Sequence, residues 1–487
     1  MTQHQELERP TRPTYGNWVR VQAPGLFGHG PLPTAILLTT PLAAMIAAVA
    51  RGLPAGIVLG LLGIAALALV GTPAGSIVLR RTARLIALRR GTDLHLRGAI
   101  SGHDDGNRLP GLLARTRLLS MVDPQGRSFA VLAHPRDLWT VVALCRADNP
   151  ALASRDHLDA RVGGFARLLA AAGAEPGLVC LKTITETSPA DVIDLTVAVS
   201  AARAVGAPAI ARAVMDECAT AYPVGTHDER TWVEVTFRGR VLSPAGGEAG
   251  VLTELARRVP GLLERLADAG AGQVRMAGTD DITRAVREAY APAEGFPADG
   301  VGWEQAGPSA AFESWADYRH DTGRSMTWEL DSPPRAAMTE LALAPLLAPI
   351  PGLTAKRVAI LHCPDDPGTS ARRAETDAQA AVFAAAHNTR NRVTADAGAR
   401  VRATEQARHE IAAGAVLDRF TLLVTATVKD GQDVESMVSA VEAAAGSVPL
   451  RLRRCYATQA AAFATTLPVG FLPNEHTVIP QAVRDLA

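Results

Sequence analysis

Two short polar segments have the residue types that metal or acid–base chemistry needs. The triplet His103 to Asp105 is the densest, but Gly102 and Gly106 flank it, which favours a solvated turn over a metal site. The segment His362 to Asp366 ends a predicted strand, a place where ligands often cluster. Because adjacent strand residues point to opposite faces, its histidine and cysteine are expected to point apart. An enzyme that uses this second segment stays an open alternative.

The most distinctive patch contains three of the six tryptophans. Its members are Trp303, Trp315, Tyr318, Arg319, His320 and Trp328. A packed core cluster would have this composition, and so would an interaction surface anchored by aromatic and arginine side chains. We take these six residues as a candidate interaction surface.

The sequence lacks the signatures of common enzymes. Only Lys182, Lys356 and Lys429 are lysines, and none follows a glycine, so a Walker A phosphate loop is excluded. The G-x-S-x-G, H-E-x-x-H and G-x-G-x-x-G motifs are absent too. The five cysteines form no C-x-x-C pair. We therefore predict a non-enzymatic protein with no catalytic, metal or cofactor residues.

Composition narrows the class of protein further. The 487 residues include 49 basic and 49 acidic ones, and this balance argues against direct nucleic-acid binding. Mean hydropathy is +0.10 although 20% of the residues are charged. Apolar residues must therefore be concentrated in part of the chain.

That concentration lies near the start, in the two uncharged stretches Leu32 to Ala50 and Leu53 to Val70. As helices, each would nearly span the ~30 Å hydrocarbon layer of a bilayer. Arg51, Gly52 and Pro54 would form the tight hairpin loop between them. A signal peptide and a buried soluble helical hairpin are the alternatives. We predict a transmembrane hairpin over residues 32–79.

Arginine sets the expected orientation. A cytoplasmic basic flank follows the hairpin and consists of Arg80, Arg81, Arg84, Arg89 and Arg90, whereas the loop offers Arg51 alone. The positive-inside rule then places both termini in the cytoplasm, with residues 1–31 as a cytoplasmic N-terminal segment. Neither apolar stretch contains an ionisable residue, so the hairpin is predicted to be an anchor in the cell membrane and not an ion pathway.

The remainder reads as an α+β protein. Alternating strand and helix patterns predict one cytoplasmic domain over residues 91–295 and a second over 296–487, separated by a Gly/Pro-bearing stretch. Residues 370–415, rich in Ala, Arg, Glu and Gln, predict a long helical segment in the second domain. Both domains follow a similar order of strands and helices, which favours a duplicated α/β-like sandwich unit.

Three stretches carry a resemblance to a family. They are the opening Arg12 to Trp18, the middle Glu304 to Gly323, and Lys356 to Leu361. Together they resemble actinobacterial two-span membrane proteins of conjugative and type IV secretion-like gene clusters. The hairpin is similar to the small PrgI-type membrane subunit. The turn Leu467 to Gly470 is similar to one in the non-catalytic N-terminal part of type IV secretion ATPases.

The resemblance implies a scaffold or platform subunit of a transfer apparatus. Its expected partners are the lipid bilayer, further copies of itself and a secretion or conjugation ATPase supplied in trans, since this chain has no phosphate loop. An EccE-like membrane subunit of a type VII secretion system is the alternative machine. A membrane-tethered enzyme is the alternative class.

Overall fold

A computed structural model gives the fold. It describes residues 31–71, 94–96, 108–146, 153–189, 204, 206–221, 227–244, 246–294, 300–332, 334, 338–387 and 395–476. The predicted N-terminal segment 1–31, except Pro31, and the basic flank from Arg80 to Arg90 lie outside these residues.

The elements follow one another in a mixed order. The helices are α1 (Pro31–Arg51), α2 (Leu53–Gly71), α4 (Arg155–Ala174), α6 (Ala209–Ala221), α7 (Gly239–Leu242), α8 (Gly247–Leu266), α9 (Thr279–Tyr290), α10 (Ala344–Leu347), α11 (Pro367–His387), α12 (Ala395–Ala412), α13 (Val434–Gly446) and α14 (Gln459–Thr465). The strands are β1 (Leu94–Leu96), β2 (Arg117–Val122), β3 (Ser128–His134), β4 (Leu138–Arg146), β5 (Leu178–Pro189), β6 (His227–Arg238), β7 (Gln273–Met276), β8 (Ala310–Glu313), β9 (Tyr318–His320), β10 (Gly323–Ser332), β11 (Ala355–Pro364), β12 (Asp418–Lys429) and β13 (Arg451–Arg454). The predicted α+β class is confirmed.

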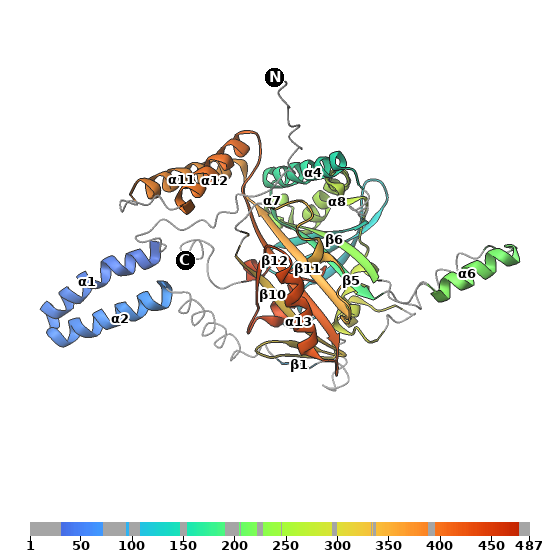
Figure 1. Ribbon diagram of the computed structural model, residues 1–487, viewed down its shortest axis with the longest axis horizontal. Helices are drawn as coiled ribbons and strands as arrows, with labels where there is room; N and C mark the ends of the chain where they lie inside the picture. The colour runs from blue at the N-terminus through green and yellow to red at the C-terminus, as the bar shows by residue number, and fades with distance from the viewer. Residues whose placement is uncertain are drawn as a thin grey trace, which may run out of the picture. The chain divides into compact units, whose positions relative to one another are not determined.

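The strands form one 13-stranded sheet whose named ladders are antiparallel. From β8 the order is β8-β9-β10-β12-β11-β5-β6-β4-β3-β2, with β13 beside β10 and β7 beside β4. The long strands β12, β11, β6 and β5 run through the centre of Figure 1. The sheet continues across the predicted boundary at residue 296, because β5 pairs with β11 from Lys356 opposite Thr187 to His362 opposite Leu181.

The sheet order repeats itself about this central pairing. Counted from the centre, the first half runs β5-β6-β4-β3-β2 and the second runs β11-β12-β10-β9-β8. In each half a helix, α8 or α13, connects two strands that flank a third one, so both halves contain a split βαβ unit. This agrees with the duplicated unit that the sequence favours.

Individual side chains follow the repeat. His134 ends β3 and His320 ends β9, and the turn after each contains an aspartate with positive φ, Asp137 (63°) and Asp321 (31°). Short polar residues tolerate this conformation better than bulky ones. The strand that follows each turn, β4 or β10, carries a hydroxyl side chain that hydrogen-bonds to a hydroxyl side chain of the neighbouring strand, β6 or β12.

Apolar side chains on one face of the sheet form two cores, one for each half. The first includes Val141, Val235 and Phe237 under α8, and the second includes Met326 and Val424 of the sheet with Val441 of α13. Because side chains alternate along a strand, the residues between these apolar ones point to the opposite face. That face carries the buried polar side chains.

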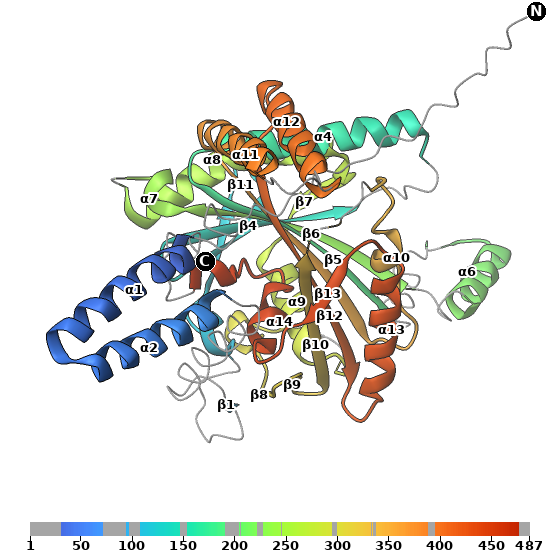
Figure 2. The same ribbon diagram turned by 60° about the vertical axis from the view of Figure 1, so that its left-hand side comes forward.

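The predicted helical segment 370–415 consists of two helices, α11 and α12. Residues 388–394 between them lie outside the described residues. The two helices are drawn beside each other in both Figure 1 and Figure 2.

Helices α1 and α2 form an antiparallel hairpin, drawn side by side in Figures 1 and 2. Arg51 ends α1, Gly52 adopts a positive φ of 93°, and Pro54 is the second residue of α2, so the predicted loop is where the sequence places it. Side chains of the hairpin are described from Ile36 to Ala68. Within the residues described, no helix is both long and apolar enough to cross a membrane, so the membrane-spanning part of the prediction has no support here.

Candidate functional site

Hydroxyl side chains line the polar face of the sheet. Thr140 on β4 bonds to Thr236 on β6 at 2.8 Å, and in the second half Ser325 on β10 bonds to Thr427 on β12 at 2.8 Å. All four residues are at most 1% exposed. Buried hydroxyls need partners, and these strands supply them to one another across the ladder.

Lys182 on β5 lies at the centre of this face. Its ammonium group is 2.6 Å from the carboxylate of Glu234 on β6, and both side chains are at most 1% exposed. Burial raises the pKa of Glu234, and the charge of Lys182 opposes that rise. Removing either charge would leave the other buried without a counter-ion, which costs far more than losing a surface pair.

The ammonium group of Lys182 also holds the turn after α14. It donates to the carbonyl of Thr465 at 3.0 Å and lies 3.4 Å from that of Phe471. The amide of Gly470 donates to Glu234 at 2.9 Å. Gly470 has φ of 69°, and a Cβ there would lie 2.7 Å from Nε2 of His134, so only glycine fits. The Leu467 to Gly470 turn is thus fastened onto the first half of the sheet.

A second buried cation lies near the first. Arg357 on β11 is ion-paired and hydrogen-bonded to Glu186, which is opposite it on β5, and the two residues are 2% and 6% exposed. This pair bridges the two halves at their junction. Together the buried pairs and hydroxyls form a polar centre, defined here as Lys182, Glu186, Glu234 and Arg357 with their hydroxyl neighbours.

The predicted interaction patch is divided among different environments. Tyr318 and His320 are at most 3% exposed and pack with Tyr290 and Phe463, with ring centroids of His320 and Phe463 4.8 Å apart. Trp328 is 2% exposed in the second apolar core. The assignment of these three to a surface is wrong, because the sheet and α14 bury them.

The other three members of the patch lie nearer the solvent. Trp315 is 46% exposed and stacks on Tyr456 at 6.1 Å. Arg319 is exposed and forms an ion pair with Asp430 at 3.1 Å. Trp303 is half-buried, and its indole N–H donates to the carbonyl of Thr116 at 3.0 Å. They do not form one contiguous site with the buried three.

Burial keeps His320 neutral, and its hydrogen bonds fix which nitrogen carries the proton. Its Nδ1 is 2.7 Å from the carbonyl of Tyr290, so Nδ1 carries a proton, and Nε2 accepts from Ser325 at 2.8 Å. Burial, with a smaller contribution from the charge of Arg357, lowers the pKa of His320 to about 4. A histidine held in one tautomer away from solvent is a packing element of this cluster.

The His362 to Asp366 segment contributes one member of a histidine–aspartate pair. Nδ1 of His362 is 2.5 Å from Asp418, and its ring packs edge-on against Phe165. Cys363 is on the opposite face and hydrogen-bonds Cys180, whose pKa is raised well above its ordinary value by that bond and by burial. Such thiols are poor nucleophiles. Among the described residues, no three His, Cys, Asp or Glu side chains are grouped to hold a metal.

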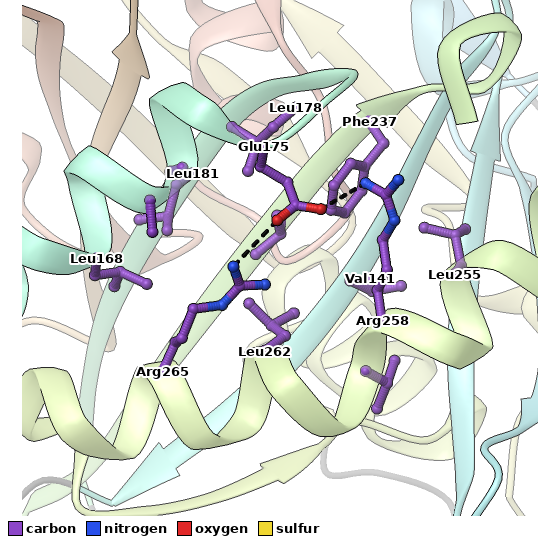
Figure 3. A pocket seen from close by; sticks show the side chains of 14 residues that line it. Val141, Leu168, Glu175, Leu178, Leu181, Phe237, Leu255, Arg258, Leu262 and Arg265 are labelled. Atoms are coloured by element: carbon purple, nitrogen blue, oxygen red, sulfur yellow. Dashed lines mark hydrogen bonds and ion pairs between the residues drawn. The ribbon is translucent and has the colours of Figure 1, made fainter. Parts of the chain in front are cut away.

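An apolar cavity lies between α4, α8 and the sheet (Figure 3). Its volume is about 20 Å³, roughly the room one water molecule requires. Figure 3 shows Glu175 between two arginines of α8, at 2.6 Å from Arg258 and 3.1 Å from Arg265. This ion-pair network lines the cavity, and the space is too small for a substrate.

The sequence offered one signal for the polar centre that the prediction did not use. Lys182 is a cation between the apolar residues Leu181 and Ile184 of β5, in a chain with only three lysines. A buried lysine in such a strand requires a carboxylate partner. Its partner Glu234 is 52 positions away in the numbering, and only the fold brings the two together.

In comparisons with known proteins, no family model and no curated protein matches the chain. Its function must therefore be argued from its own residues.

Proposed function

We propose that this chain is a non-enzymatic subunit of the inner membrane, a scaffold or platform for a conjugative or type IV secretion-like transfer apparatus. The observation that carries the membrane part is the α1–α2 hairpin. Its large apolar side chains are exposed around the whole surface of the pair, for example Leu38 (62%), Val49 (85%) and Ile64 (65%). A continuous apolar surface of this kind is unfavourable in water and marks a binding or lipid-facing region.

The packing inside the hairpin supports a lipid environment. Ala44 and Ala48 of α1 face Gly56 of α2, where a Cβ would lie 2.6 Å from the Cβ of Ala48. Small residues that let two helices approach closely are typical of helix pairs in membranes. No Asp, Glu, Lys or Arg occurs between Leu53 and Gly71, so α2 has no charge that burial in hydrocarbon would have to accommodate.

The proposed platform function and the type IV-like machine rest on a sequence resemblance to membrane proteins of conjugative and type IV secretion-like gene clusters. The stretches that carry this resemblance are residues 12–18, 304–323 and 356–361. The described body adds a rigid scaffold, a 13-stranded sheet with buried ion pairs at its centre. Both termini and the body would be cytoplasmic, with the ATPase recruited from a separate chain.

Membrane insertion is tested by cell fractionation and labelling. The tagged full chain should remain in membranes after alkaline carbonate extraction. A cysteine in place of Arg51 should react with an impermeant maleimide from outside the cell, whereas one in place of exposed Arg212 on α6 should react only after lysis. Release by carbonate, or labelling of both positions only after lysis, contradicts a two-span anchor.

The machine is tested by mild-detergent purification from the native host. Recovery in a large oligomer with a type IV-like ATPase supports the proposal. Recovery with core subunits of a type VII system would assign the chain to that exporter as an EccE-like subunit. A stable monomer without partners would contradict both.

The His362–Asp418 pair favours a second candidate, a membrane-tethered enzyme. Alanine at His362 and, separately, at Asp418 should leave transfer activity unchanged in the folded protein if the chain is a platform. Loss of transfer with unchanged stability and unchanged partner recovery would instead favour the enzyme.

A further inference from the structure

Two cysteines face each other where the two halves of the sheet join. The last pair of the β5–β11 ladder is His362 opposite Leu181. The same register, continued by one residue, places Cys363 on β11 opposite Cys180 on β5. Their thiols are hydrogen-bonded to each other. Each half contributes one of the two cysteines, so a covalent bond between them would join the halves at their junction.

Backbone hydrogen bonds define the type of this pair. The amide of Asp365 donates to the carbonyl of Leu417 at 2.8 Å, so the backbone groups of Asp365 point toward the β12 side of β11. Backbone groups alternate in direction along an antiparallel strand, so those of Cys363, two residues earlier, also point toward β12 and away from β5. Cys363 and Cys180 therefore form a non-hydrogen-bonded pair.

This type of pair suits a disulfide bond. In a non-hydrogen-bonded pair the Cα atoms are about 4.5 Å apart, and the side chains lie closer together than in the alternate pair. A disulfide requires Cα atoms about 4.4–6.8 Å apart. The two thiols can therefore be joined without moving the strands apart.

The two thiols differ in their access to solvent. Cys180 is 1% exposed, and its hydrogen bond to Cys363 and its burial hold its pKa well above the ordinary value. Cys363 is half-buried, and the side chain opposite it on β12, Arg419, is 48% exposed. A reagent from solvent therefore reaches Cys363 first, and Cys180 reacts with a sulfur that is already held beside it.

We propose that Cys180 and Cys363 form a reversible disulfide when the protein meets a low-molecular-weight disulfide. The thiolate of Cys363 attacks one sulfur of the small disulfide and releases one small thiol. Cys180 then gives up its proton, attacks the sulfur of Cys363 and releases the second small thiol. Two protein thiols and one small disulfide thus become one protein disulfide and two small thiols.

The bond would make the junction of the halves sensitive to redox state. Disulfides do not persist in a reducing compartment, so the bond is present only while oxidant exceeds small thiol. It closes the long stretch of chain between Cys180 and Cys363, and it should raise the thermal midpoint of the protein by about 5 °C. This inference concerns the sheet alone and is independent of membrane insertion.

The test uses the full chain with a protease site inserted between residues 295 and 299, which separates the two cysteines. The purified protein is treated with oxidised glutathione, its remaining thiols are blocked, and it is cut and run on a denaturing gel. The two fragments should stay joined and should separate after addition of dithiothreitol. Trypsin digestion of the oxidised protein should give residues 168–182 linked to residues 358–372.

Cysteine variants identify the bond. Cys363→Ser and Cys180→Ala should each abolish the link between the fragments. Cys145→Ala and Cys455→Ala, at buried cysteines of the first and second half, are matched controls and should keep it. Thermal midpoints of the reduced variants show which of them fold, and Cys363→Ser, at the less buried position, keeps the test valid if Cys180→Ala does not.

Three results would overturn the proposal. One is separation of the fragments after oxidation of the wild type. Another is a link that persists in folded Cys363→Ser, because that link would come from other cysteines. The third is glutathione that stays attached to Cys363 while no link forms, which would show that Cys180 does not reach it.

Discussion

Lysine is scarce in this chain, and two of the three lysines are buried at 1% exposure, Lys182 and Lys356. Lys182 binds the carbonyl of Thr465, and Lys356 donates to those of Leu346, at 2.6 Å, and Ala348. An ammonium group is compact and has three donors, so it fits a ring of carbonyls that a flat guanidinium would not. Burial lowers the pKa of Lys356 to about 8.

Lys182→Met should lower the free energy of unfolding by about 3–5 kcal/mol, because Glu234 would remain buried without its counter-ion. Adding Glu234→Gln should recover part of that loss. Urea unfolding followed by tryptophan fluorescence measures both. Lys429→Met, at the exposed lysine, is the control and should change stability by less than about 0.5 kcal/mol. A similar small effect of Lys182→Met would show that the ion pair does not contribute.

His320 should make stability depend on pH. Its folded pKa of about 4 lies below the ordinary value near 6.5, so the unfolded chain binds the proton first. The contribution of neutral His320 is complete above about pH 6.5 and is lost as the pH falls toward 4. Between pH 7 and 4.5, the wild type should lose about 2–3 kcal/mol more than His320→Gln. Parallel pH curves would contradict a neutral buried imidazole, and His227→Gln, at an exposed site, is the control.

At the scale of the element, the hairpin depends on glycines of unequal importance. Gly56 faces α1, and a Cβ there would lie 2.8 Å from the carbonyl oxygen of Ala44. Gly60, one turn later, has no atom within 4 Å of such a Cβ. The close approach of α1 and α2 therefore requires a small residue at one position and tolerates a large one at the other.

Gly56→Leu should separate the two helices, whereas Gly60→Leu should not. Spin labels at exposed Leu38 and Ile64 report the separation by double electron–electron resonance in detergent or lipid. We expect a longer and broader distance distribution for the first variant only. Equal distributions in both variants would show that glycine packing does not hold the hairpin.

At the scale of the whole molecule, the C-terminal part of each half of the sheet contacts the other half. The end of α9 contacts the second half, where the carbonyl of Tyr290 accepts a hydrogen bond from His320, and the turn after α14 contacts the first half at Glu234. The β5–β11 ladder joins the halves between these contacts. Neither half has its complete polar surroundings alone.

A protease site inserted between residues 295 and 299 should therefore leave the halves associated after cleavage. The cut chain should elute from a sizing column with the uncut one and separate only in denaturant. Arg357→Glu, which places two carboxylates opposite each other at the junction with Glu186, should weaken that association, and Arg419→Glu, at a more exposed arginine, is the control. Separation of the cut wild-type halves in native buffer would show that these contacts do not hold the two halves together.

Sequence patterns predicted a helix or strand well where residues close together in the chain determine it. The apolar stretches Leu32 to Ala50 and Leu53 to Val70 correspond to α1 and α2 within one residue at each end, and the helical segment 370–415 corresponds to α11 and α12. The interaction patch was predicted less well. Trp315 and Trp328 both belong to the aromatic patch of the sequence, yet Trp328 is 2% exposed and Trp315 is 46% exposed. Burial depends on which elements pack above each residue, and the sequence near a tryptophan does not show this.

The sequence by itself determined the alternation of strands and helices, the apolar hairpin with its Arg51–Gly52 turn, and the absence of a phosphate loop, because periodicity, charge and short motifs are local properties. Only the tertiary structure decided that Lys182 meets Glu234, that Arg357 meets Glu186, and that Cys180 meets Cys363. These pairs are joined through ladders between strands far apart in the chain, and their register is set by the packing of the whole sheet.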